Sequence, residues 1–103
     1  MSRHIRAKVD ANQATLVAAL RKLGATVQHL HTVGQGCPDL LVGYRGKNYL
    51  LEVKCMRSPT RREPMTGQQI RWHTRWRGQA MVVTDIEDFT DYVSCETKGA
   101  SYT

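Results

Sequence analysis

The chain contains 103 residues, which suits one small domain with a modest hydrophobic core. Lys and Arg outnumber Asp and Glu by 15 to 9, and the resulting formal net charge of +6 favours an anionic partner, most commonly nucleic acid, over a merely soluble basic protein. No apolar run reaches the roughly 18 residues of a membrane span and no signal-peptide core follows the N-terminus, so we expect a cytoplasmic protein with no membrane partner.

The first predicted element is a helix over residues 11–23, preceded by a loose basic arm at residues 1–9. Asp10 is placed to cap the N-terminus of this helix, and Gly24 is placed to end it. Apolar residues recur at helical spacing and form one face: Leu16, Val17, Leu20 and Leu23. We expect this face to pack on the core.

Three short strands should follow this helix. The apolar runs at residues 25–31, 39–44 and 48–55 predict strands, and a turn at 45–47 joins the last two as a hairpin. The tight loop at 34–38 contains two glycines. These glycines either let the backbone approach a metal or phosphate, or only make the turn.

The second half of the chain predicts a loop, a helix, a strand and a last short helix. Their expected positions are a basic, proline-marked loop at 56–65, a helix at 67–77 between a Thr66 cap and Gly78, a strand at 80–84, a helix at 86–93 and a frayed tail at 95–103. The order αβββαβα implies one α/β domain over residues 1–103, in which a mixed sheet of about four strands is flanked by helices.

The most informative residues are the charged ones in the predicted hairpin. Asp39 opens one apolar run, and Glu52 and Lys54 lie inside the next. Two positions apart on a strand, Glu52 and Lys54 point to the same face. Burying them is unfavourable unless they pair or hold a metal, and two carboxylates beside a lysine suit a hard cation and phosphodiester hydrolysis. The plainer interpretation is a surface ion pair on a half-exposed edge strand.

These residues, in this order, resemble a known family. Gly36-Cys37-Pro38-Asp39, a hairpin, Glu52-Val53-Lys54, then Gln69 and Trp72 are similar to the PD-(D/E)XK nuclease superfamily, and within it to the virus-type replication-repair nuclease (VRR-NUC) domain. The resemblance spans roughly residues 10–94 and implies a restriction-endonuclease-like αβββαβ core.

The resemblance also implies roles for particular side chains. Asp39 and Glu52 would bind Mg²⁺ or Mn²⁺, with the carbonyl of Val53 as a further ligand. Lys54 would activate the attacking water or stabilise the transition state, and Gln69 would lie at the edge of the active site. The first helix often supplies another acidic ligand in this family, and here that helix offers Asp10.

Basic residues surround the predicted site in the sequence, and we interpret them as contacts to DNA phosphates without base readout. They are Arg57, Arg61 and Arg62 after the catalytic strand, Arg71 and Arg75 on the next helix, and Lys47 in the hairpin turn. Solvated charges are the alternative. Trp72 and Trp76, four apart on a helix, either pack in the core or stack on bases.

Histidines and cysteines give weaker signals. His29 and His31 alternate on one strand and suit a polar sheet face better than a metal site. His73 either reaches the site as an acid or base or is an exposed helical residue. Three cysteines without Cys-X-X-Cys spacing indicate free thiols.

The sequence therefore predicts a Mg²⁺- or Mn²⁺-dependent DNA endonuclease. The resemblance implies a phage origin and a branched substrate such as a four-way junction. A non-catalytic DNA-binding module and a nuclease acting on RNA are the alternatives. One site cuts one strand, so symmetric nicking of a junction favours a homodimer. The apolar candidates for its contact are Trp76, Met81 and Phe89.

Overall fold

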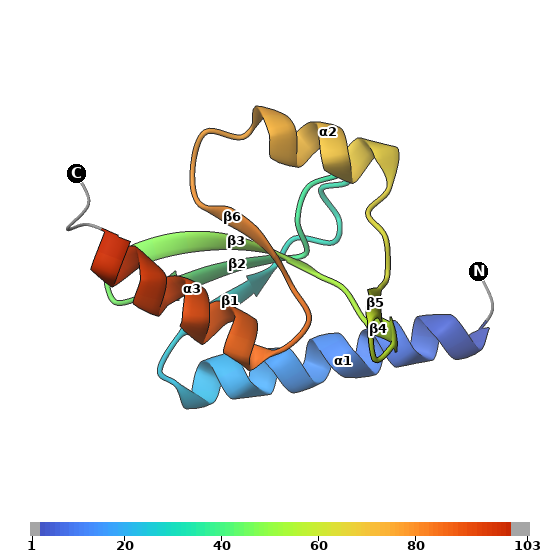
Figure 1. Cartoon of the computed structure of the whole chain (residues 1–103), viewed down its shortest axis with the longest axis horizontal. Coiled ribbons are helices and arrows are strands. Elements are labelled where there is room, and N and C mark those ends of the chain that lie inside the picture. Colours follow the sequence, from blue (N-terminus) through green and yellow to red (C-terminus); the bar gives the residue numbers. More distant parts are fainter. Residues whose placement is uncertain (1–2, 100–103) are drawn as a thin grey trace.

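The computed structural model describes residues 3–99, with side-chain surroundings for residues 9–96 (Figure 1). Within these residues the elements follow in the order α1 Arg3–Lys22, β1 Thr26–His29, β2 Leu40–Tyr44, β3 Lys47–Val53, β4 Met56–Ser58, β5 Arg61–Arg62, α2 Gly67–Arg75, β6 Ala80–Val83 and α3 Ile86–Gly99. This confirms the predicted mixed α/β architecture, with the small β4–β5 hairpin inserted after β3.

The main sheet has the strand order β1-β2-β3-β6, in which β1, β2 and β3 pair antiparallel and β6 pairs parallel to β3. A parallel pair needs a crossover connection, which here contains the β4–β5 hairpin and α2. Helices α1 and α3 lie together against one face of the sheet, and α2 lies on the other side (Figure 1).

The hydrophobic core lies between the sheet and the pair α1 and α3. Alternate residues of β3 enter it, and Phe89 of α3 packs edge-on against the rings of Tyr44 and Tyr49. The buried apolar residues include Leu16, Val17 and Leu20 of α1, Leu40 and Val42 of β2, and Tyr49, Leu51 and Val53 of β3. The intervening residues of β3, among them Glu52, must therefore point to the opposite face, toward α2.

Helix α1 begins well before its predicted start. Residues 3–9, expected to form a loose arm, are helical, so Asp10 lies within the helix and is exposed, and it caps nothing. This stretch contains Arg, Ala and Lys, which favour helix, and neither Gly nor Pro to interrupt it. Residues 1 and 2 of the predicted arm lie outside the described residues.

The C-terminal half also differs in detail. Helix α3 continues to Gly99, so the predicted frayed tail is wrong for residues 95–99, while residues 100–103 lie outside the described part. Glu96 anchors this extension because its carboxylate accepts hydrogen bonds from Tyr49 Oη at 2.7 Å, Lys47 Nζ at 3.1 Å and Gln79 Nε2 at 3.0 Å. Part of the loop at 56–65 forms the β4–β5 hairpin.

Among the helices in the described part of the chain, none has the length and apolar character needed to cross a membrane.

Candidate active site

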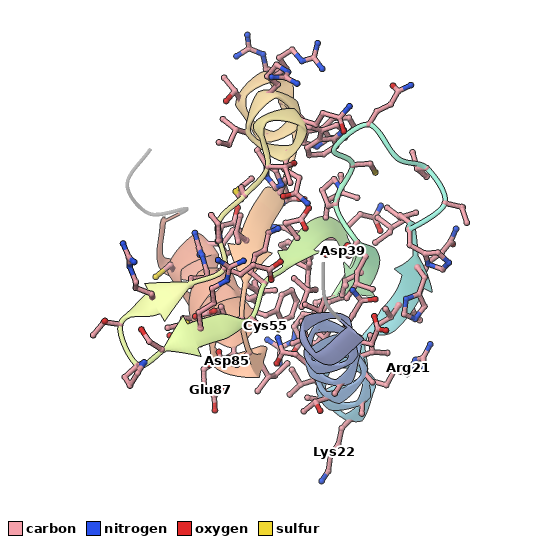
Figure 2. All side chains as sticks on the ribbon, turned by 90° about the vertical axis from the view of Figure 1, so that its right-hand side faces the viewer. Arg21, Lys22, Asp39, Cys55, Asp85 and Glu87 are labelled. Atoms are coloured by element: carbon pink, nitrogen blue, oxygen red, sulfur yellow. The ribbon has the colours of Figure 1, made fainter. Side chains whose placement is uncertain are left out.

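The β2–β3 hairpin brings the two predicted carboxylates together. Leu40 pairs with Leu51, so Asp39, one residue before β2, lies opposite the Glu52 end of β3. The Oδ2 atom of Asp39 accepts a hydrogen bond of 2.8 Å from the backbone N–H of Val53. Figure 2 looks toward this end of the sheet, with Asp39 between α1 and α2 in the view. The Asp39 carboxylate is thus fixed by the strand that carries Glu52.

Glu52 and Lys54 are both buried, with 1% and 4% of their surface exposed. The Nζ atom of Lys54 donates a 2.8 Å hydrogen bond to Oε1 of Gln69 and lies 3.9 Å from Oε2 of Glu52. Burial of both groups excludes the surface ion pair that the sequence left open. A buried ammonium must be paired in this way, because removing it from water is unfavourable.

Gln69 connects the two charges. Its Nε2 donates to Oε2 of Glu52 at 3.1 Å, while its Oε1 accepts from Lys54. An amide can do both, because it carries a donor and an acceptor. Gln69 also completes a capping box with Thr66, which fixes the first turn of α2. The structure therefore places Gln69 at the site, whereas the neighbouring Gln68 is exposed.

The glycine loop packs the Asp39 segment against α2. Gly36 has φ of +82°, and a Cβ atom there would lie 2.3 Å from the backbone oxygen of Gln68. Only glycine allows both this conformation and this approach. At Gly36, therefore, the loop serves the contact with α2. Residues Gly34 and Gln35 also have positive φ, of 73° and 57°, which makes the turn.

The surroundings of Glu52 disfavour the ionised form of its carboxyl group. Burial raises the pKa of Glu52 to about 8, and the negative charge of Asp39 adds to the rise, which Lys54 only partly opposes. Among the described side chains, Oε1 of Glu52 is one of two buried polar atoms with no hydrogen-bond partner. A carboxylate in this state is stabilised by a proton or by a cation beside it.

The donor set fits a hard divalent cation. Asp39 and Glu52 supply carboxylate oxygens, which Mg²⁺ prefers, and Mg²⁺ usually keeps several waters and uses only one or two protein carboxylates. Within the described residues, no group of three or more His, Cys, Asp or Glu side chains is arranged to hold a metal. A cation here would therefore depend on two carboxylate side chains, with water and the predicted Val53 carbonyl left to complete its shell.

The structure does not bring Asp10 to these carboxylates. Its exposed side chain lines a separate hollow on α1, together with Gln13, Arg21 and His29. The prediction assumed that a helix starting at residue 11 would place Asp10 at its N-terminus. In the longer helix Asp10 points from the middle of α1, and the geometry does not support it as a ligand.

Lys47 also lies away from the site. It pairs with Tyr44 at the turn end of the hairpin, four residues of β2 beyond the Leu40 end, or roughly 13 Å at strand spacing. Its ammonium forms an ion pair with Glu96 at 3.1 Å. The predicted arginines are better placed: Arg57, Arg61 and Arg62 are exposed around the β4–β5 hairpin, and Arg71 and Arg75 are exposed on α2.

The sequence did not assign Glu63 to the site, and it left open whether His73 reaches the site or is an exposed helical residue. Glu63 lies 3.8 Å from Lys54 Nζ and accepts a hydrogen bond of 3.1 Å from the N–H of Cys55. It is the only acidic residue in the basic stretch at 56–65, which was an available signal. His73 has a buried Nε2 without a partner among the described residues, and burial followed by the charge of Lys54 lowers its pKa.

When the chain was compared with protein-family models, curated proteins and solved structures, none of them matched.

Proposed function

We propose that this chain is a Mg²⁺- or Mn²⁺-dependent DNA endonuclease of the PD-(D/E)XK type, acting on branched DNA. The observation that carries the proposal is the connected group of buried Glu52 and Lys54 with half-buried Asp39 and Gln69, in which Oε1 of Glu52 has no hydrogen-bond partner among the described residues. A metal-free structural core has no need of such an arrangement, because an unpaired buried carboxylate is destabilising.

Each residue of the group has a task that its contacts support. A bound divalent cation supplies Lewis-acid stabilisation of charge on the scissile phosphate and lowers the pKa of water. Asp39 is held in place by Val53 N–H, and Gln69 fixes Oε2 of Glu52, which leaves Oε1 of Glu52 free to contribute to a cation site. Fixing both carboxylates in advance avoids reorganisation during the reaction.

Lys54 is the cationic partner of the reaction. It is oriented by Gln69 and balanced by Glu52 and Glu63, so its ammonium stays beside the carboxylates. In that position it can donate a hydrogen bond to the attacking water or to the charge that develops on the phosphate. The exposed arginines of the β4–β5 hairpin and of α2 would hold the flanking phosphates.

The proposal is tested by incubating the protein with linear, flapped and four-way DNA, and with the corresponding RNAs, in Mg²⁺ or Mn²⁺. We expect cleavage of branched DNA that stops on addition of EDTA. Cleavage that persists in EDTA would contradict the metal mechanism. Cleavage of the RNAs alone would replace the proposed substrate, and binding of DNA without any cleavage would favour a non-catalytic module.

A further inference from the structure

A second surface lies beside the candidate active site, between α2 and the loop at residues 30–37. It is a groove with a volume of about 770 Å³, and the residues that define it are Val33, Cys37, Leu50, Arg71, Trp72 and Trp76, with Arg75 at its edge. The groove takes no part in the contacts of Asp39, Glu52 or Lys54 described above. Helix α2 and its C-cap residue Trp76 supply both the aromatic rings and the cationic groups of the lining.

The aromatic wall consists of two stacked indoles. The rings of Trp72 and Trp76 lie 4.6 Å apart, centroid to centroid, and are inclined by only 15°. No residue of α2, all of which the structure describes, is buried, and Trp76 is 47% exposed. These rings therefore do not form the core, which excludes one of the two interpretations that the sequence left open. They present a flat apolar face at the surface.

The positive charge of the groove indicates which kind of ligand it can bind. Arg71 and Arg75 line it, and none of its lining residues in the described part of the chain is acidic. A second copy of this chain would bring another net charge of +6 to the same surface, which is unfavourable. A ligand with flat apolar rings and regularly spaced negative charges is complementary to stacked tryptophans between arginines, and a nucleic acid strand has that chemistry.

The strand must be unpaired. In a duplex the faces of the bases are stacked on each other and are not available to an indole, whereas a single strand exposes them. The groove also leads to the candidate active site. Leu50 lines the groove and Glu52 follows two residues later on the same face of β3, and Gln68 lines it directly before Gln69. A strand lying in the groove would continue toward the carboxylates.

We propose that this groove binds an unpaired segment of the DNA substrate, with a base stacked on Trp76 and the adjoining phosphates held by Arg71 and Arg75. The proposed binding of DNA follows from the residues of the groove alone, whereas a role of this binding in cleavage rests on the nuclease function proposed above. The proposal implies that single-stranded nucleotides adjoin the scissile bond, as they do in a flap or in a four-way junction opened at its branch point.

The test measures binding without cleavage. Fluorescence anisotropy in EDTA compares a labelled oligo(dT) with a blunt duplex of equal length, for the wild type and for Trp76→Leu, which keeps apolar bulk at an exposed position. We expect Trp76→Leu to weaken binding of oligo(dT) about tenfold, the loss of one stacked base, and to change duplex binding by less than about twofold. The matched control is Ile70→Ala, which removes another apolar side chain from α2 that is 53% exposed and does not line the groove.

Several results would overturn the proposal. Unchanged oligo(dT) affinity in Trp76→Leu, or an equal loss for duplex and oligo(dT), would show that no base stacks there. Self-association of the wild type that disappears in Trp76→Leu, with DNA affinity retained, would assign the groove to a second copy. The assay in EDTA measures binding without cleavage. Weaker binding of oligo(dT) by Trp76→Leu, together with no cleavage by the wild type in Mg²⁺ or Mn²⁺, would therefore support the groove as a binding site and contradict the proposed nuclease function.

Discussion

Among single residues, Glu52 shows most clearly how stability and chemistry conflict in this molecule. It is buried beside Asp39, and among the described residues one of its oxygens has no hydrogen-bond partner. A residue chosen for stability alone would be apolar or fully hydrogen-bonded at this position, because an unsatisfied buried polar group costs about 1–3 kcal/mol. The carboxylate is instead what a cation site requires.

The free energy of unfolding should depend on pH, because the ionised form of Glu52 is disfavoured in the folded state. The pKa of Glu52 is about 8 in the folded state, against roughly 4.3 in an unfolded chain. The contribution of Glu52 to stability is therefore fully present below about pH 4 and is lost as the pH rises through 8. We expect Glu52→Gln, which cannot ionise, to gain stability relative to the wild type by on the order of 2 kcal/mol between pH 5 and pH 9 in EDTA.

Thermal unfolding of both proteins across this pH range checks the expectation. Added Mg²⁺ should stabilise the wild type most at high pH, where the carboxylate is available to it, and should leave Glu52→Gln nearly unchanged. A stability difference between the two proteins that stays constant from pH 5 to pH 9 would show that Glu52 does not titrate in this range.

Gln69 tests the link between the cap of α2 and the site. Gln69→Ala removes the hydrogen bonds to Glu52 and Lys54 as well as half of the capping box. We expect cleavage to fall by about 10- to 100-fold, the usual effect of losing a residue that orients a metal ligand, with a stability loss of about 1 kcal/mol. Thr74→Ala, an exposed change on the same helix, is the control. Equal cleavage rates in Gln69→Ala and the control would contradict the orienting role.

At the scale of elements, the β4–β5 hairpin and α2 present basic side chains on either side of the site. Double charge reversal of Arg61 and Arg62 should weaken binding to every duplex sequence alike. It should also reduce the slope of log affinity against log salt by roughly 0.9 for each lost phosphate contact. Salt titrations of two unrelated duplexes measure this. A loss confined to one sequence would indicate base readout instead.

Lys47→Gln is the matched control for this experiment. Its ammonium pairs with Glu96 at the far end of the hairpin. The sequence grouped Lys47 with the DNA-binding residues, whereas its position in the fold predicts that Lys47→Gln leaves the salt slope unchanged. A reduction of the salt slope by roughly 0.9, the value for one lost phosphate contact, would show that Lys47 contacts DNA.

The elements differ in how well the sequence predicts them, for physical reasons. The apolar run at 48–55 and the Thr66 cap are local signals, and they correctly predict β3, although the strand ends at Val53, and the start of α2. The predicted start of α1 is too late because the prediction weighs Asp10, a residue type that favours the N-cap, above the helix propensity of residues 3–9. Glu63 and His73 approach Lys54 only through tertiary folding, and no spacing rule reveals such contacts.

At the scale of the whole molecule, one face of the sheet forms the hydrophobic core and the other carries the charged residues of the candidate site. Helices α1 and α3 cover one face and form the core, while the other face carries Glu52 and Lys54 toward α2 (Figure 1). Arg21 and Lys22, at the end of α1, lie on the opposite side of the molecule from α2 in Figure 2.

The proposed homodimer belongs to this scale as well. Phe89 is fully buried and Met81 packs against the core, so neither is free to form the contact expected from the sequence. We still expect a dimer, because symmetric cleavage of a four-way junction needs two sites. Light scattering at micromolar concentration should give about twice 11.7 kDa. A mass of one chain, with junction cleavage intact, would show that dimers form only on DNA or not at all.

The proposed metal-dependent nuclease activity depends on the carboxylates of Asp39 and Glu52. The most direct test is single-turnover cleavage of a labelled four-way junction in Mn²⁺ by the wild type and by Glu52→Gln, compared at equal DNA occupancy. We expect the substitution to reduce the rate by about a thousandfold or more while DNA affinity stays the same, because an oxygen needed for the cation is lost. Cleavage by Glu52→Gln at the wild-type rate would contradict the account.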